Sequence, residues 1–133
     1  PAFTLVETLV ALGVFAAFTS LMIVIFPTAI KIISSGNQLT VAANLMEAKI
    51  ESLRTIPYND LTAGIYENNI HADLNPNSPY YKFTHTVTID RLDDNLNVAG
   101  SETGMKRITL TTTWFDPLRG NQSKTLYTIV ITY

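Results

Sequence analysis

The chain has 133 residues, of which 47% are hydrophobic and 15% are charged, and its formal charge is −2 at pH 7. That length leaves room for one small globular domain, and the slight acidity argues against nucleic acid, so we predict no specific nucleic-acid partner. The absence of cysteine excludes disulfides and thiolate metal sites, and we predict neither a cofactor nor a metal site.

The first thirty residues are the most apolar part of the chain, and we predict a hydrophobic helix over 1–30. No charged side chain occurs from Thr8 to Ile30, and a helix of that length rises roughly 34 Å, enough to cross a bilayer core of about 30 Å. No Lys or Arg precedes this run, and it is longer than the apolar part of a secretory signal. We therefore expect a membrane anchor or the buried shaft of an assembly.

Glu7 is the single charge at the head of this helix. An ionised carboxylate facing hydrocarbon costs roughly 3 kcal/mol on insertion scales, so such a residue normally has a partner or a function. One interpretation places Glu7 at the membrane interface or in the first helical turn, where the helix dipole favours negative charge. The other is that an amine of another subunit neutralises Glu7 in an apolar core.

The residues around Glu7 favour the second interpretation. The string FTLVE, from Phe3 to Glu7, opens an apolar helix and resembles the processed N-terminus of the type IV pilin family. The resemblance implies that a prepilin peptidase removes a basic leader before Phe3, that the new amino group is N-methylated, and that Glu7 pairs with the N-terminal amine of a neighbouring subunit. Because Pro1 and Ala2 precede Phe3, either two residues from before the cleavage point remain or the Pro1 amine is the partner.

Gly13 and Pro27 are the weak points of the apolar helix. Gly costs about 1 kcal/mol relative to Ala in a helix interior, and Pro27 removes the amide that would bond the carbonyl of Ile23. One interpretation is that a membrane helix simply tolerates both residues. The other, which the resemblance to pilins implies, is that the segment between them loses helicity when subunits pack into a filament.

From Lys31 the pattern becomes amphipathic, and we predict that 31–56 is the second half of the same helix. Apolar residues recur at steps of three and four, and we expect this face to pack against a sheet: Leu39, Ala42, Ala43, Met46, Ile50 and Leu53. Pro57 disfavours helical backbone at its predecessor, so the helix should end near Ile56. The stretch from Glu47 to Leu61 resembles the helix end of minor pilins and of secretion pseudopilins.

The segment 57–133 is predicted to form a globular head. Asn, Asp, Gly and Pro cluster between residues 57 and 79, so we expect a connecting loop there. His71, Asp73 and Asp60 lie in this loop without the fixed spacing of a metal site, and we interpret them as solvated loop residues.

Three stretches of the head have the period-two pattern of half-buried strands, at 80–92, 105–115 and 124–133. Short polar loops separate them, so we predict an antiparallel sheet over 80–133 whose apolar face covers the helix. Rows of threonine mark the opposite face, either as a plain solvent-exposed surface or as a site of O-glycosylation. His85 falls on the inward side, where we interpret it as a hydrogen-bonded histidine at the edge of the core.

The predicted fold class is therefore α+β, a long N-terminal helix with a small antiparallel sheet packed on its C-terminal half. Three functions fit it. The first is a structural subunit of a type IV pilus-like filament, which is a homo-oligomer. Such a subunit would lie in the inner membrane before assembly, have prepilin peptidase and the membrane assembly machinery as partners, and end in an extracellular filament. The second is a minor pilin or type II secretion pseudopilin that initiates or tips a fibre, which the head resembles more. The third is a single-pass membrane-anchored binding domain. No grouping of residues suggests catalysis, so we do not expect an enzyme.

Overall fold

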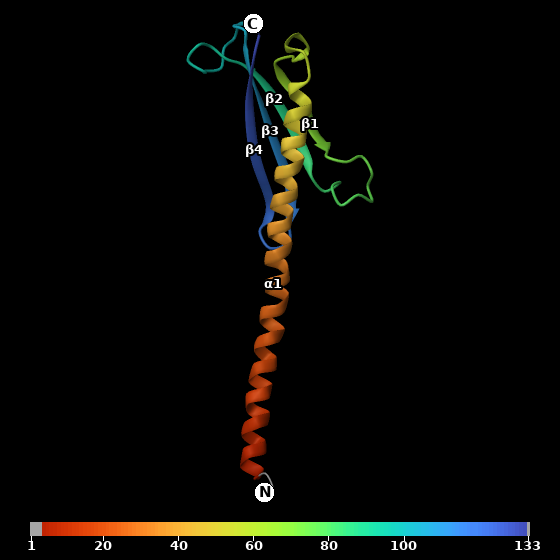
Figure 1. Cartoon of the computed structure of the whole chain (residues 1–133), viewed down its shortest axis with the longest axis vertical. Helices are drawn as coiled ribbons and strands as arrows, with labels where there is room; N and C mark the ends of the chain where they lie inside the picture. The colour runs from red at the N-terminus through yellow and green to blue at the C-terminus, as the bar shows by residue number, and fades with distance from the viewer. Residues whose placement is uncertain (1–3, 133) are drawn as a thin grey trace.

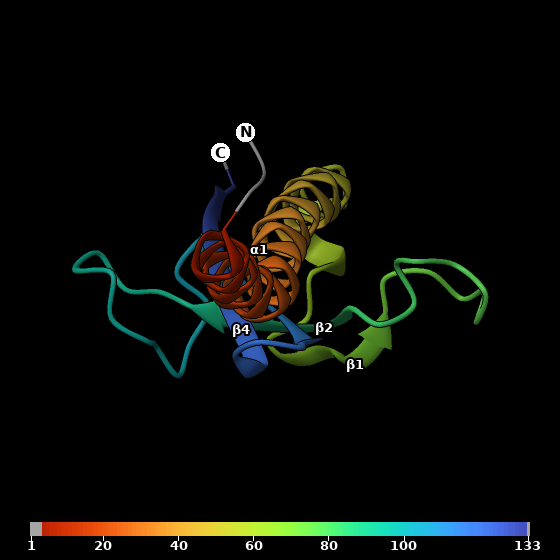
Figure 2. The ribbon, with the colours of Figure 1, turned by 90° about the horizontal axis from the view of Figure 1, so that it is seen from below.

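The computed structural model of the chain describes residues 4–132 and shows one long helix with a sheet against its C-terminal half (Figure 1). The sheet is antiparallel, has four strands in the order β1-β2-β3-β4, and covers one side of the helix (Figure 2). This α+β arrangement agrees with the predicted fold class and is compatible with a pilin-like fold. The elements are α1 (Leu5–Arg54), a 3-10 turn η1 (Tyr58–Asp60), β1 (Gly64–His71), β2 (Thr84–Arg91), β3 (Met105–Asp116) and β4 (Gly120–Ile131).

The helix α1 is continuous over 50 residues, and both of its ends have a local cause. At the start, the Thr4 side chain accepts a hydrogen bond from the Glu7 amide at 3.3 Å, which satisfies one of the free donors of the first turn. At the end, the Thr55 amide donates to the Ser52 carbonyl at 3.3 Å, two residues before Pro57 excludes further helix. The helix thus ends within two residues of the predicted position.

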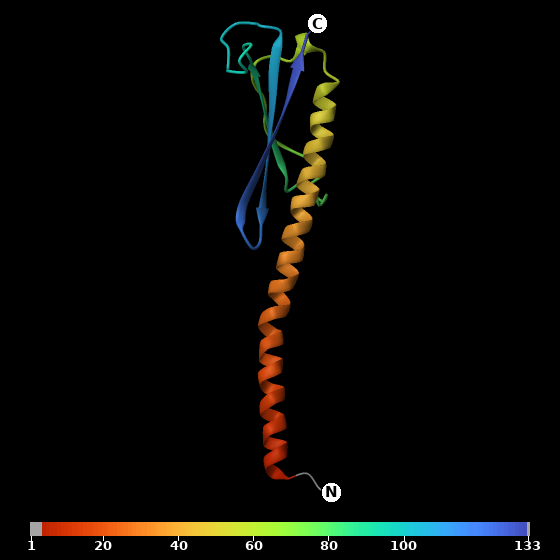
Figure 3. The ribbon, with the colours of Figure 1, turned by 60° about the vertical axis from the view of Figure 1, so that its left-hand side comes forward.

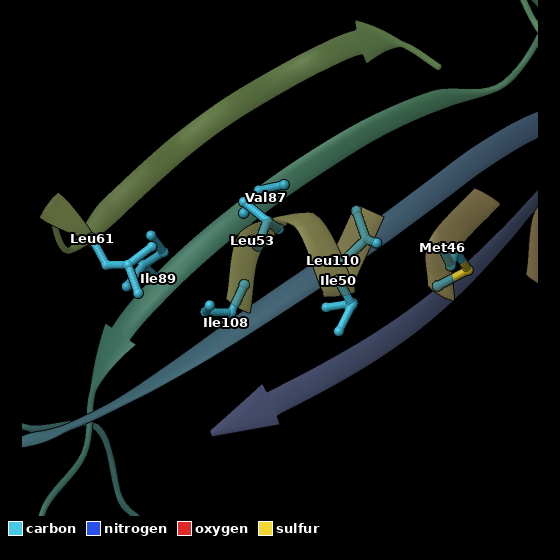
Figure 4. Packing of buried hydrophobic residues seen from close by; sticks show 8 residues of the cluster. All are labelled: Met46, Ile50, Leu53, Leu61, Val87, Ile89, Ile108 and Leu110. Atoms are coloured by element: carbon cyan, nitrogen blue, oxygen red, sulfur yellow. The ribbon is translucent and has the colours of Figure 1, made fainter. Parts of the chain in front are cut away.

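The hydrophobic core lies between the last turns of α1 and the middle of the sheet (Figure 4). Met46, Ile50 and Leu53 are buried on the sheet-facing side of the helix, as the stripe pattern implies. Every side chain of the central cluster is at most 6% exposed, and the cluster comprises Met46, Ile50, Leu53, Leu61, Val87, Ile89, Ile108 and Leu110.

Leu39, which the sequence pattern assigns to this stripe, is 42% exposed and does not belong to the core. The buried side of α1 instead continues through Ser35 and Gln38, because the helix meets a polar part of the sheet there. A hydrogen bond from the Ser35 hydroxyl holds the pKa of Asp116 below its usual value, so serine suits this contact better than leucine. A pattern that counts only apolar residues follows the wrong side of the helix at this point.

The strand β1 lies inside the segment 57–79, so the prediction of a connecting loop there is wrong for residues 64–71. Its pairing with β2 shifts register twice, between Ile65 and Glu67 and between Glu67 and Ile70. These irregularities remove the period-two pattern that identifies a strand, which explains why the sequence hides it. An ion pair of 2.7 Å between Lys49 of α1 and Glu67 ties this edge strand to the helix.

The strand β4 turns its more apolar side away from the helix. Thr128 and Val130 face α1, whereas Tyr127, Ile129 and Ile131 lie on the outer face of the sheet with the threonine rows. The cause lies at the end of α1, where the Arg54 guanidinium donates to the Thr128 hydroxyl at 2.8 and 3.1 Å. In the view of Figure 3, β4 runs beside the helix toward the far end of the head.

Truncation of Leu53 to alanine should lower the free energy of unfolding of the head by about 3 kcal/mol, because the change leaves a cavity where a fully buried side chain stood. Urea unfolding of the full chain in detergent micelles, followed by the fluorescence of Trp114, measures it. Leu39→Ala is the matched control on the same helix and should cost less than about 1 kcal/mol, since Leu39 is exposed. Equal losses in the two variants would contradict this account of the core.

Candidate functional site

The first half of α1 stands free of the head, and we call residues 4–33 the shaft. Every residue of the shaft is exposed, including large apolar side chains such as Leu5, Val10 and Phe15, which the helical repeat places on three different sides of the helix. A helix that is apolar on all sides needs apolar surroundings, which water does not provide. The shaft belongs to a helix that is long and apolar enough to cross a membrane by length and composition, so it could serve as an anchor.

Glu7 lies in the first turn of the shaft, where its amide is held by the Thr4 hydroxyl. The Thr8 amide and hydroxyl both donate to the Thr4 carbonyl, at 3.2 and 3.3 Å, so the backbone around Glu7 is fixed. The structure therefore gives the carboxylate a favourable place near the positive end of the helix dipole. The other residues assigned to this site, Pro1 and Phe3, lie outside the described residues.

The hydroxyl groups of the shaft are satisfied within the helix. Those of Thr19, Ser20 and Thr28 donate to carbonyl groups four residues earlier, at 2.8, 2.8 and 3.0 Å. A polar side chain that bonds its own backbone can enter an apolar environment without losing a hydrogen bond. Because α1 remains helical through Gly13 and Pro27 in the single chain, the loss of helicity in an assembly stays a prediction.

The two histidines of the head have different environments. The His71 ring stacks on Tyr81 at 3.9 Å between ring centroids, and its Nδ1 lies 2.6 Å from the Tyr81 carbonyl oxygen. His85 is buried on the inward side of β2, with its Nδ1 2.8 Å from the Thr112 hydroxyl, as predicted. Burial, and then the positive charge of Lys49, lower the pKa of His85, while Glu67 acts in the opposite direction.

Two carboxylates of the connecting loops, those of Asp73 and Asp93, accept hydrogen bonds from their own loop. Bonds from Ser78 and from the Asn75 amide hold the pKa of Asp73 below its usual value. The amides of Asn97 and Asn95 lower the pKa of Asp93 in the same way. Among residues 4–132, no group of three His, Cys, Asp or Glu side chains is arranged to hold a metal ion.

Four side chains at the far end of the head, which the sequence analysis did not identify, contact one another in a polar cluster that we call the clamp: Tyr58, Arg91, Glu102 and Lys106. Glu102 accepts hydrogen bonds from the Tyr58 hydroxyl and, at 3.0 Å, from Arg91, which together lower its pKa. Burial and the bond to Glu102 raise the pKa of Tyr58 to about 12. The Lys106 ammonium lies 3.9 Å from the centroid of the Tyr58 ring and donates to the Tyr58 carbonyl at 3.0 Å. Tyr58 is 44 residues from Glu102 in the chain, so no local motif signals the clamp.

Comparison with family models, with curated proteins and with solved structures finds no match to this chain. The features that bear on function are therefore the shaft and the geometry of the head.

The low pKa of His85 should make the head less stable in acid. The unfolded chain binds a proton at this histidine near its ordinary pKa of 6.5, whereas the folded chain does so only at lower pH, so the free energy of unfolding falls as the pH drops below 6.5. Urea unfolding between pH 7 and pH 5 should show this decrease, and His85→Asn should flatten it. The same change at His71 is the control, and an equal flattening there would refute the assignment to His85.

Proposed function

We propose that this chain is a structural subunit of a type IV pilus-like filament that polymerises by packing of its shafts. The observation that carries the proposal is the shaft itself, exposed along its whole length and charged only at Glu7 between residues 4 and 30. Side-by-side packing with other shafts removes this apolar surface from water, as insertion in a membrane does before assembly. The small head then lies at the surface of the filament.

Within such a filament Glu7 would pair with the N-terminal amine of a neighbouring subunit. A carboxylate enclosed by apolar helices is strongly unfavourable alone and acceptable only with a well-placed positive partner. We infer that Pro1 or Phe3 supplies that amine, depending on where processing by a prepilin peptidase ends. The subunit would leave the inner membrane through an assembly machinery and reach an extracellular filament.

Replacement of Glu7 by alanine tests this assignment. In cells that carry the assembly machinery, Glu7→Ala should reduce the amount of sheared fibre at least tenfold, because the shaft loses the carboxylate that would pair with the neighbouring amine, while insertion in the membrane improves. Immunoblots of the fibre and membrane fractions, with electron microscopy of the fibres, provide the measurement.

Glu51→Ala is the matched control for that experiment, since Glu51 is an exposed carboxylate on the head-bearing half of the same helix. It should leave the fibre yield unchanged. Normal fibre yield from Glu7→Ala would refute the assembly role of Glu7. A wild-type chain that stays monomeric in the membrane under these conditions would favour the single-pass anchored binding domain instead.

We further propose that the shaft loses helicity between Gly13 and Pro27 on assembly. The double change Gly13→Ala and Pro27→Ala should stabilise the helix there by roughly 4 kcal/mol, because both residues disfavour the helix interior. Amide hydrogen exchange should then show residues 13–27 less protected in wild-type fibres than in micelles, and equally protected in the two states of the variant. Full protection of this segment in wild-type fibres would refute the proposal.

A further inference from the structure

The outer edge of β4 is an open strand edge. Its twelve residues pair with β3 in unbroken register from Gly120 to Ile131, and among residues 4–132 no strand pairs with the other side. Such an edge presents a row of free backbone N–H and C=O groups to any extended chain beside it. Proteins commonly protect an edge strand with bulges, prolines or several charged side chains. The strand β4 has no bulge and no proline, and its one charged residue is Lys124.

The opposite edge of the sheet is protected. The pairing of β1 with β2 shifts register twice, and Asn69 within the strand has a φ of 54°. The Glu67 side chain is also directed inward, to its ion pair with Lys49. A strand with these irregularities cannot present an even row of donors and acceptors, so the sheet is open to addition on the β4 side alone.

A groove runs between this open edge and the helix. It is a hollow of about 440 Å³, and its walls are mostly apolar, with one charge on each side. The helix contributes Leu39, Ala43, Met46 and Glu47, and the strand contributes Lys124, Thr125 and Leu126. Leu39 and Leu126 are 42% and 41% exposed, so the apolar lining is accessible from outside.

We propose that this groove binds an extended segment of another polypeptide, which adds to β4 as a fifth strand. The backbone of the segment would satisfy the free edge, and its inward side chains would enter the groove, as in other domains that bind peptides between an edge strand and a helix. Lys124 and Leu126 face the helix two residues apart, opposite Thr112 and Leu110. The segment therefore carries an acidic and an apolar residue with one residue between them, to meet these two side chains.

A second copy of β4 does not fit the site in a membrane-anchored chain. The strand β4 runs along α1 in the same direction, from the shaft toward the far end of the head (Figure 1). An antiparallel β4–β4 pair related by a two-fold axis would direct the two shafts to opposite sides, so both could not enter one membrane. Addition of a peptide to β4 does not require filament assembly, because the strand edge and the groove both lie outside the shaft.

Binding of a designed peptide to the full chain in detergent micelles tests the proposal. The probe is an acetylated nine-residue peptide of alternating threonine and valine, in which the second valine is replaced by aspartate. It should bind and slow amide hydrogen exchange in residues 120–131, whereas the same peptide N-methylated at every amide should not bind, because it has no donors for the edge. No binding, equal binding of the methylated peptide, or protection confined to β1 or the shaft would each overturn the proposal.

Variants of the groove sharpen the test. Ala43→Trp fills the groove and should weaken binding at least tenfold, while the control Asn44→Trp, on the neighbouring position outside the groove, should leave it within about threefold. Lys124→Glu should weaken binding of the aspartate peptide. A peptide with lysine in place of the aspartate should bind this variant again, and a variant whose head is unfolded could not show such a recovery. Equal effects at residues 43 and 44, or no rescue, would overturn the proposal. Fibre yield is read separately, so Glu7→Ala should leave peptide binding unchanged.

Discussion

The apolar surface of a helix must be covered from water, and this constraint governs both halves of α1. In the second half, the sheet covers one side of the helix and the other side is polar, so the head satisfies the requirement by itself. In the shaft nothing from the described chain covers any side. The same continuous element is therefore complete at one end and needs other molecules at the other, whether lipids or further subunits.

The sheet is fixed on the helix by more than apolar burial. Lys49 binds Glu67 in one edge strand, and Arg54 binds Thr128 in the other, so two basic residues flank the buried stripe and each holds one side of the sheet. Apolar packing is non-directional and would permit the sheet to rotate about the helix axis. These two polar contacts define one orientation, and they also explain why β4 presents a threonine to the helix and its tyrosine and isoleucines to the outside.

The long helix, its end before Pro57 and the three regular strands could be predicted from the sequence, because each depends on local patterns of apolar residues and prolines. The strand β1 could not, since its bulges remove the alternation that identifies a strand. The apolar pattern assigns Leu39 to the core because it ranks leucine above Ser35 and Gln38, and only the position of Asp116 shows why the helix turns polar residues inward there. At the candidate site, the apolar run and Glu7 were readable from the sequence, whereas the clamp around Glu102 depends on contacts between distant segments.

The clamp of Tyr58, Arg91, Glu102 and Lys106 closes the far end of a head that has no cysteine. It joins the turn after the helix to the β2–β3 loop across more than forty residues, as a covalent cross-link would. Unlike a disulfide, it needs no oxidant and no isomerase to form, so the head can reach its final shape equally in a reducing or an oxidising compartment. Its weakness is of a different kind, because ions at high concentration screen such contacts where they reach the surface.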